Sequence, residues 1–128
     1  MKPEARILAL LLFSLALTCC KDKNDSCPVC GVNDPMENLP WLKSTLMLYS
    51  AADYQSLEKI DLYEYNARQL VLFSWQLNGI EDAPTGAIYN CDGDVLYYCG
   101  GYQPFDSCSY IIARSKFVRN IWDKQNNH

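Results

Sequence analysis

The stretch that decides the fold is AIYNCDGDVLYYCG, residues 87–100, because it describes a complete β-hairpin in one run of sequence. Two apolar runs, 87–89 and 95–98, flank the pair Asp92-Gly93. An Asp-Gly pair in that position predicts a two-residue turn in which both residues have a positive φ. In that register Cys91 lies opposite Asp94, and Cys99 lies opposite Gly86.

A second hairpin precedes the first in the chain. Residues 60–65 and 69–76 are rich in β-branched and aromatic side chains, and residues 66–68, Asn-Ala-Arg, can turn between them. Near the end of the chain, the stretch SCSYIIARSKFVRNIW, residues 107–122, predicts a short helix followed by a strand at 117–122. The sequence therefore supplies four or five strands.

A helix precedes both hairpins. Leu39, Leu42, Leu46 and Tyr49 recur at helical spacing, which predicts a helix over residues 39–52. Asn38 can cap this helix, with Pro40 in its first turn. The order of elements predicts a single α+β domain, with one main helix packed on an antiparallel sheet of about four or five strands.

The N-terminus has the features of an export signal. Lys2 and Arg6 precede an apolar run at 7–17, which is shorter than the ~20 residues that span a bilayer as a helix. The run ends in LTCC, residues 17–20, which resembles the bacterial lipoprotein box. That resemblance implies that residues 1–19 are a signal peptide and that Cys20 becomes the lipid-carrying first residue. An ordinary signal peptide cleaved nearby is the alternative, and it would leave Cys20 free to pair elsewhere.

The N-terminal pattern divides the chain into three parts. After the signal peptide, residues 20–33 hold the lipidated cysteine and a polar tether containing KDKNDS, and residues 34–128 form the globular domain. Lipoprotein modification adds several acyl chains, and more than one chain gives stable anchoring. We therefore expect the membrane to be a partner through the lipid anchor, with the domain at either the periplasmic or the cell-surface face of the outer membrane.

Three stretches together resemble a family of small uncharacterised lipoproteins of the Bacteroides group. These are CGVNDPMENLPWLK (residues 30–43), YNCDGDVLYYCGG (89–101) and the late IW (121–122). The resemblance covers most of the mature chain and implies a lipid-anchored single domain. It implies no catalytic activity and no cofactor.

Charge and histidine content disfavour several functions. Without residues 1–19, 9 basic and 14 acidic side chains remain, which gives a net charge of −5. Nucleic acid calls for clustered Lys and Arg, so we expect no nucleic-acid partner. His128 is the only histidine and ends the chain, where it is a poor candidate for a catalytic base. We therefore expect a protein that is not an enzyme.

Five cysteines remain once Cys20 carries lipid, so at most two intramolecular disulfides form and one thiol is left over. In an exported protein we expect disulfides. A Cys91–Cys99 bond is disfavoured, because the hairpin places the two on opposite faces and beyond the ~7 Å Cα separation of a disulfide. We expect one bond to Cys108 and a second from Cys27 or Cys30 that fastens the N-terminal segment.

Two other functions of the cysteines stay open. Cys27 and Cys30 in SCPVCG have the spacing of half a zinc site, although no second half is recognisable. The same pair could exchange disulfides, although no strand precedes it as in thioredoxin-like proteins. A thiol-exchange or zinc-binding envelope protein is therefore the alternative function.

Aromatic residues provide the candidate binding surface. Tyr97, Tyr98, Tyr102 and Phe105 gather around the hairpin of residues 87–100. Tyrosines are favoured where a protein buries surface against a partner, so a protein or glycan ligand is possible here. The alternative is that these rings form the sheet core and cross-strand pairs. We expect a lipid-anchored envelope protein with a non-catalytic binding or structural role.

Overall fold

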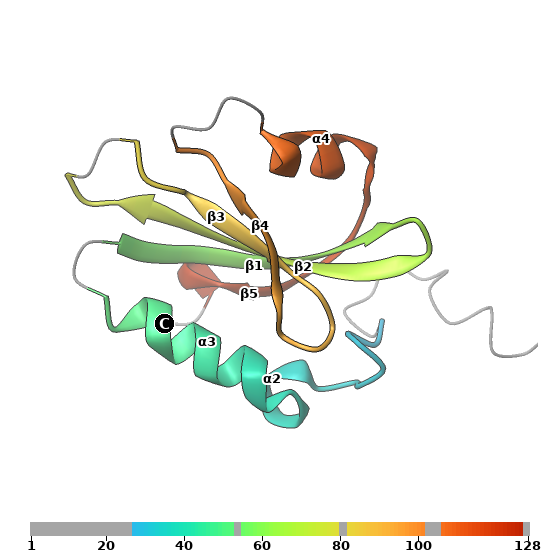
Figure 1. Cartoon of the computed structure of the whole chain (residues 1–128). Helices are drawn as coiled ribbons and strands as arrows, with labels where there is room; N and C mark the ends of the chain where they lie inside the picture. The colour runs from blue at the N-terminus through green and yellow to red at the C-terminus, as the bar shows by residue number, and fades with distance from the viewer. Residues whose placement is uncertain (1–26, 53–54, 80–81, 102–105, 127–128) are drawn as a thin grey trace, which may run out of the picture.

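Five strands form one antiparallel sheet in the order β4-β3-β2-β1-β5 (Figure 1). This computed structural model describes residues 27–52, 55–79, 82–101 and 106–126; the predicted signal peptide, Cys20 and the start of the predicted tether lie outside these ranges. The strands are β1 (Gln55–Tyr65), β2 (Arg68–Leu77), β3 (Gly86–Tyr89), β4 (Val95–Cys99) and β5 (Lys116–Asp123). The helices are α2 (Pro35–Asn38), α3 (Pro40–Ser50), α4 (Ser107–Arg114) and the 3-10 helix η2 (Lys124–Asn126).

The helices lie on both faces of the sheet. Figure 1 shows α2 and α3 on one face and α4 on the other. The antiparallel sheet of an α+β fold is thus confirmed, but one main helix is not clearly shown, because α4 covers a face of its own. The reason lies in β2, where Leu70 is buried toward α4 and the neighbouring Val71 is buried toward α3. A strand with two apolar faces needs a layer on each.

The α3 face holds the larger core. Tyr49 of α3 stacks on Trp75, and its hydroxyl lies 2.7 Å from that of Tyr89. Trp75 Nε1 donates to the Pro84 carbonyl at 2.7 Å. Burial raises the pKa of Tyr89, so its hydroxyl stays protonated. The polar atoms of these rings therefore have partners, as buried polar groups require.

The predicted helix is present, but its start differs from the prediction. Leu39 is the N-cap of α3 and Pro40 its first residue, while Asn38 is the last residue of the short helix α2. Asn38 therefore does not cap α3. Pro40 takes the first helical position, where its missing N–H removes no hydrogen bond.

The turn at Asp92-Gly93 differs from the predicted two-residue turn. Gly93 has a positive φ of 86°, and Asp92 is not among the positive-φ residues. Asn90 N–H donates to the Asp94 carbonyl at 3.0 Å, so residues 91–93 form the loop and Cys91 has no strand partner opposite it. The Asn90 side-chain oxygen accepts from the N–H groups of Asp92 and Asp94, at 2.9 Å each. An Asx-type bond of this kind stabilises the observed turn.

The predicted register holds at the far end of this hairpin and shifts near the turn. Cys99 pairs with Gly86, as predicted. The register then shifts, so that Tyr89 pairs with Val95 and Leu96 is the extra residue of a β-bulge. A bulge places two successive side chains of one strand opposite a single partner residue. Leu96 and Tyr97 both line a cleft on the α4 face as a result.

The two-residue turn with two positive φ values occurs instead in the β1–β2 hairpin. Asn66 and Ala67 have φ values of 50° and 58°. Asn tolerates this left-handed region, but an alanine there costs roughly 1–2 kcal/mol.

We predict that Ala67→Gly raises the free energy of unfolding by about 0.5–1 kcal/mol, because glycine adopts this conformation without strain. Urea denaturation measures the change. Ala51→Gly is the matched control, because Ala51 has a φ of −87° and should be destabilised by the same substitution. A loss of stability in Ala67→Gly would contradict the strain at this turn.

Two disulfides fasten the outer parts of the domain to the sheet. Cys99–Cys108 joins β4 to α4 with a Cα separation of 5.1 Å, and Cys30–Cys91 joins the N-terminal segment to the hairpin loop at 5.3 Å. This pattern agrees with the expected bond to Cys108 and the expected bond from the N-terminal segment. The remaining thiol, on Cys27, is buried.

The segment from Cys27 to Val32 belongs to the packed domain. Val29 is fully buried in the core. Gln69 accepts a hydrogen bond from Cys30 N–H at 2.6 Å and donates one to the Pro28 carbonyl at 3.0 Å. The tether was predicted to extend to residue 33, whereas the domain already includes residue 27, because the apolar residues around the cysteines are buried against the sheet.

We predict that the two disulfides differ in their contribution to stability. Cys30 and Cys91 are 61 positions apart, and Cys99 and Cys108 are 9 apart. On the loop-closure estimate, the Cys30→Ala/Cys91→Ala double variant loses about 4 kcal/mol and the Cys99→Ala/Cys108→Ala variant about 3 kcal/mol. Guanidinium denaturation of both variants tests the order. A reversed order would show that native contacts of α4 outweigh the loop-closure effect.

Candidate functional site

The candidate site is a cleft on the α4 face of the sheet, with a volume of about 490 Å³. Binding pockets commonly have volumes of ~300–1,000 Å³ and combine apolar walls with a few polar groups. The cleft has that character, because aliphatic side chains, two tyrosines, an amide and a guanidinium meet in it. Its lining consists of Tyr65, Asn66, Arg68, Leu70, Leu96, Tyr97 and Ile111. We call this set the α4-face cleft.

The cleft exists because two hairpins diverge. β2 pairs with β3 only from Val71 to Ser74, so the first residues of β2 have no partner in β3. Figure 1 shows the β1–β2 turn and the β3–β4 loop pointing in different directions beyond this shared region. Leu70 lies between them on β2, and Ile111 reaches them from α4. The space between the hairpins is therefore bounded on several sides.

The polar groups of the cleft have no partners in the described part of the protein. The Tyr65 and Tyr97 hydroxyls, the Asn66 amide and the Arg68 guanidinium form no side-chain hydrogen bond or ion pair there. Tyr97 is 41 % exposed. Four side chains with donors and acceptors thus surround an apolar floor. This arrangement can bind a ligand that has both polar and apolar surfaces.

The predicted aromatic cluster is divided between the two faces of the sheet. Tyr97 lines the α4-face cleft, whereas Tyr98 lines a smaller pocket on the opposite face, of about 290 Å³, beside Tyr49 and Pro84. Alternation along β4 separates the two rings. Tyr102 and Phe105 lie outside the described residues. Of the aromatic residues singled out from the sequence, Tyr97 alone is placed in the cleft.

Sequence reasoning missed most of the cleft. Tyr65, Arg68 and Leu96 carried no signal for a site, because each is an ordinary residue of a strand or hairpin. The one available signal is the β1–β2 hairpin itself, where Tyr65 pairs with Arg68 across the turn. This pairing places the aromatic ring and the cation on the same face of the hairpin. It does not show which residues of α4 and β4 complete the cleft.

Cys27 and Cys30, predicted as a possible redox pair or zinc site, are not bonded to each other. Cys30 is bonded to Cys91, and the Cys27 thiol is buried at 5 % exposure. Reactive thiols are accessible and lie in environments that favour the thiolate. Within the described ranges, no group of three or more His, Cys, Asp or Glu side chains could hold a metal ion. The thiol-exchange and zinc alternatives thus gain no support beyond the CxxC spacing.

A second cavity of about 540 Å³ lies beside the Cys99–Cys108 disulfide, between α4 and the sheet. Its polar lining groups are the hydroxyls of Ser74, Thr85 and Ser109. It contains no charged side chain and no histidine among its lining residues. The α4-face cleft is the stronger candidate, because it combines a charged group with two aromatic rings, which can provide both affinity and orientation.

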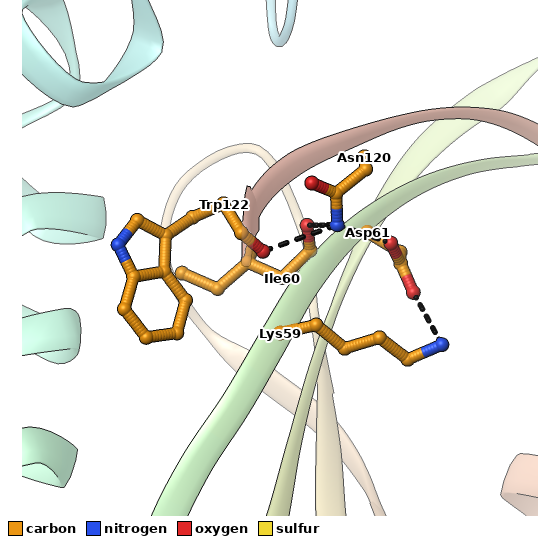
Figure 2. Close-up of polar contacts among 5 residues, drawn as sticks. All are labelled: Lys59, Ile60, Asp61, Asn120 and Trp122. Atoms are coloured by element: carbon orange, nitrogen blue, oxygen red, sulfur yellow. Dashed lines mark hydrogen bonds and ion pairs between the residues drawn. The ribbon is translucent and has the colours of Figure 1, made fainter. Parts of the chain in front are cut away.

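A buried carboxylate joins β1 to the edge strand β5 (Figure 2). Asp61 is 3 % exposed, and its Oδ2 lies 3.1 Å from Lys59 Nζ. Asn120 Nδ2 donates to Asp61 Oδ1 at 2.9 Å, to the Trp122 carbonyl at 3.1 Å and to the Ile60 carbonyl at 3.3 Å. The β1–β5 register shifts at this point, between Ile60 and Asp61. The Asn120 amide therefore bridges a β-bulge, which indicates a structural role.

The ion pair has the expected effect on Lys59. The hydrogen bond and the charge of Asp61 raise the pKa of Lys59 above its usual value. A raised lysine pKa stabilises the folded protein below the unfolded pKa, and this contribution is lost as the pH rises through the folded pKa. The pair thus contributes throughout the neutral range. Lys59 is half exposed, so water screens the interaction.

We predict that Asn120→Ala lowers the free energy of unfolding by about 2–3 kcal/mol, because it removes the hydrogen-bond partner of a buried carboxylate. Chemical denaturation measures the loss. Asn33→Ala is the matched control: Asn33 is exposed and should change stability by about 0.5 kcal/mol or less. Equal stability of the two variants would show that the Asn120 bridge is dispensable.

Comparison with protein-family models, with curated proteins and with solved structures gives no significant match. The resemblance to lipoproteins therefore stays a prediction from the sequence. None of the helices in the described ranges has both the length and the apolar character that crossing a membrane requires.

Proposed function

We propose that this chain is a lipid-anchored protein of the bacterial outer membrane whose domain binds a ligand in the α4-face cleft and catalyses no reaction. The observation that carries the proposal is the set of four polar side chains that surround an apolar cleft without partners in the described protein. Partnerless groups facing a concave surface are available to a ligand. Water satisfies them in its absence.

The chemistry of the cleft favours binding over catalysis. Its polar groups are two phenols, an amide and a guanidinium. Arginine does not give up its proton in proteins, and an amide does not titrate. General acid–base catalysis needs a group whose pKa lies near the working pH. These side chains instead provide donors, acceptors, a positive charge and aromatic surface, which are the means of recognition.

The envelope location is supported by the N-terminal pattern and by the cysteines. The lipoprotein box at residues 17–20 favours acylation of Cys20. The two disulfides of the domain are typical of proteins that fold in an oxidising compartment. Both features favour an exported protein, and the box adds a membrane anchor. The anchor then holds the cleft near the membrane surface.

We predict that Cys20→Ala abolishes lipid attachment and releases the protein from the membrane fraction, since the acyl chains provide the anchor. Metabolic labelling with a palmitate analogue, detergent-phase partitioning and the mass of the N-terminal peptide measure the effect in a producing bacterium.

Cys19→Ala is the matched control, because residue 19 leaves with the signal peptide and its alanine variant should be acylated like the unchanged protein. Acylation of the Cys20→Ala variant, or membrane release of both variants, would contradict anchoring at Cys20. Anchoring at Cys20 and ligand binding in the cleft depend on different residues, so the two parts of the proposal can fail independently.

A further inference from the structure

We propose that the α4-face cleft binds a carboxylated sugar residue, with the carboxylate on Arg68 and the sugar ring against Tyr65 and Tyr97. This inference rests on the proposed ligand-binding function and names its ligand class. Three features support it. Arg68 has no ion-pair partner among the described residues, Tyr65 and Tyr97 supply two aromatic rings, and the cleft is bounded by two hairpins and α4.

The charge of Arg68 calls for an anion. Three other cations have partners, since Lys59 pairs with Asp61, Lys124 pairs with Glu58, and Arg119 donates to the Cys27 carbonyl. Lys43 and Lys116 form no ion pair with a described residue either, but they do not line this cleft. Arg68 forms no ion pair with any described residue, although acidic side chains outnumber basic ones in the chain. The planar guanidinium matches a carboxylate with two parallel hydrogen bonds. A carboxylate in the cleft would supply this missing partner.

The rest of the lining suits a ring with several hydroxyl groups. Tyr65 and Tyr97 present an apolar ring face together with a hydroxyl that both donates and accepts. The Asn66 amide also donates and accepts. A sugar has one C–H-rich face for the aromatic surface and hydroxyls around its rim for these groups. A purely aliphatic acid would form no hydrogen bond with the Asn66 amide or with either tyrosine hydroxyl, so it would use less of the lining than a sugar does.

The position of the cleft disfavours an extended peptide added as a sixth strand. β4 is an edge strand, and its free edge faces away from β3. A peptide that pairs with β4 would therefore lie outside the sheet. The cleft lies on the inner side, between β4 and the start of β2, with Ile111 of α4 beside it. A space bounded in this way suits a compact group, such as the terminal residue of a sugar chain, better than an extended strand.

The test is a calorimetric titration of the full mature protein, extracted in detergent, with matched oligosaccharides. Trigalacturonate, a glucuronate disaccharide and sialyllactose are the acidic probes, and galactotriose and lactose are the neutral controls. We expect at least one acidic probe to bind about tenfold or more tightly than its neutral counterpart, because a charge-assisted bidentate contact contributes at least that much. We also expect its affinity to fall as salt is raised.

Variants locate the binding in the cleft. Arg68→Gln should weaken the acidic probe by about tenfold or more and leave any neutral binding unchanged. Arg68→Lys should restore affinity only in part, because lysine lacks the planar pair of donors. Lys43→Gln removes the same charge from an exposed position on α3, on the opposite face, and should bind normally. Tyr97→Ala should weaken every sugar that binds.

The possible outcomes separate this inference from the proposed function. Failure of all three acidic probes to bind, or equal loss in Arg68→Gln and Lys43→Gln, would overturn the acidic-sugar assignment. Binding of a neutral sugar as tightly as its acidic counterpart, or binding of a trialanine peptide through its terminal carboxylate more tightly than any acidic sugar, would overturn the assignment while preserving a ligand-binding cleft. Unchanged denaturation midpoints in all four variants verify that any loss of binding is not a loss of folding.

Discussion

The burial of both faces of β2 and β3 is the constraint on which the rest of this structure depends. Phe73 and Val71 are fully buried toward α3, and Ile88 is fully buried toward α4. When the central strands of a sheet are apolar on both sides, exposing either side to water costs roughly 25 cal/mol of folding free energy per Å² of apolar surface. The short chain must therefore supply two covering layers. It does so with α3 on one face and with the much shorter α4 on the other.

The length of α4 explains why the cleft is where it is. With 8 residues, α4 spans only ~12 Å, whereas the 11 residues of β1 span ~36 Å. A helix this short is marginal by itself, and the Cys99–Cys108 disulfide holds it on the sheet. It covers Ile88 and the middle of the sheet but not the end that carries Tyr65 and Arg68. The cleft is the part of the sheet face that α4 borders through Ile111 but does not cover.

Local features of this fold could be predicted from the sequence, and long-range features could not. The two hairpins, the helix around Leu42 and the short helix before the last strand follow from residue patterns within a few positions. The turn at Gly93 was predicted wrongly, because the Asn90 side chain favours a three-residue loop over the two-residue turn that Asp-Gly suggests. The cleft joins residues near positions 65–70, 96–97 and 111, which no local pattern relates. The bulge that turns Leu96 toward it depends on pairing with β3.

The N-terminal segment and the cleft are mechanically connected through the β3–β4 hairpin. The Cys30–Cys91 disulfide fixes the segment to the hairpin loop, and Trp41 stacks on Tyr89 and donates to the Cys91 carbonyl at 3.1 Å. A side chain at position 93 would collide with Trp41, since an added Cβ would lie 2.7 Å from that ring, so the loop and α3 fit closely only with glycine there. The same hairpin carries Leu96 and Tyr97 into the cleft.

This connection has a consequence for the proposed anchor at Cys20. Only seven positions separate residue 20 from Cys27, where the packed domain begins, and a fully extended chain of that length spans at most ~25 Å. The segment that begins at Cys27 is fastened to the hairpin that forms one wall of the cleft. An anchor at Cys20, as proposed, would therefore hold the cleft within that distance of the membrane. On the proposed anchoring, the domain would therefore meet its ligand close to the membrane surface.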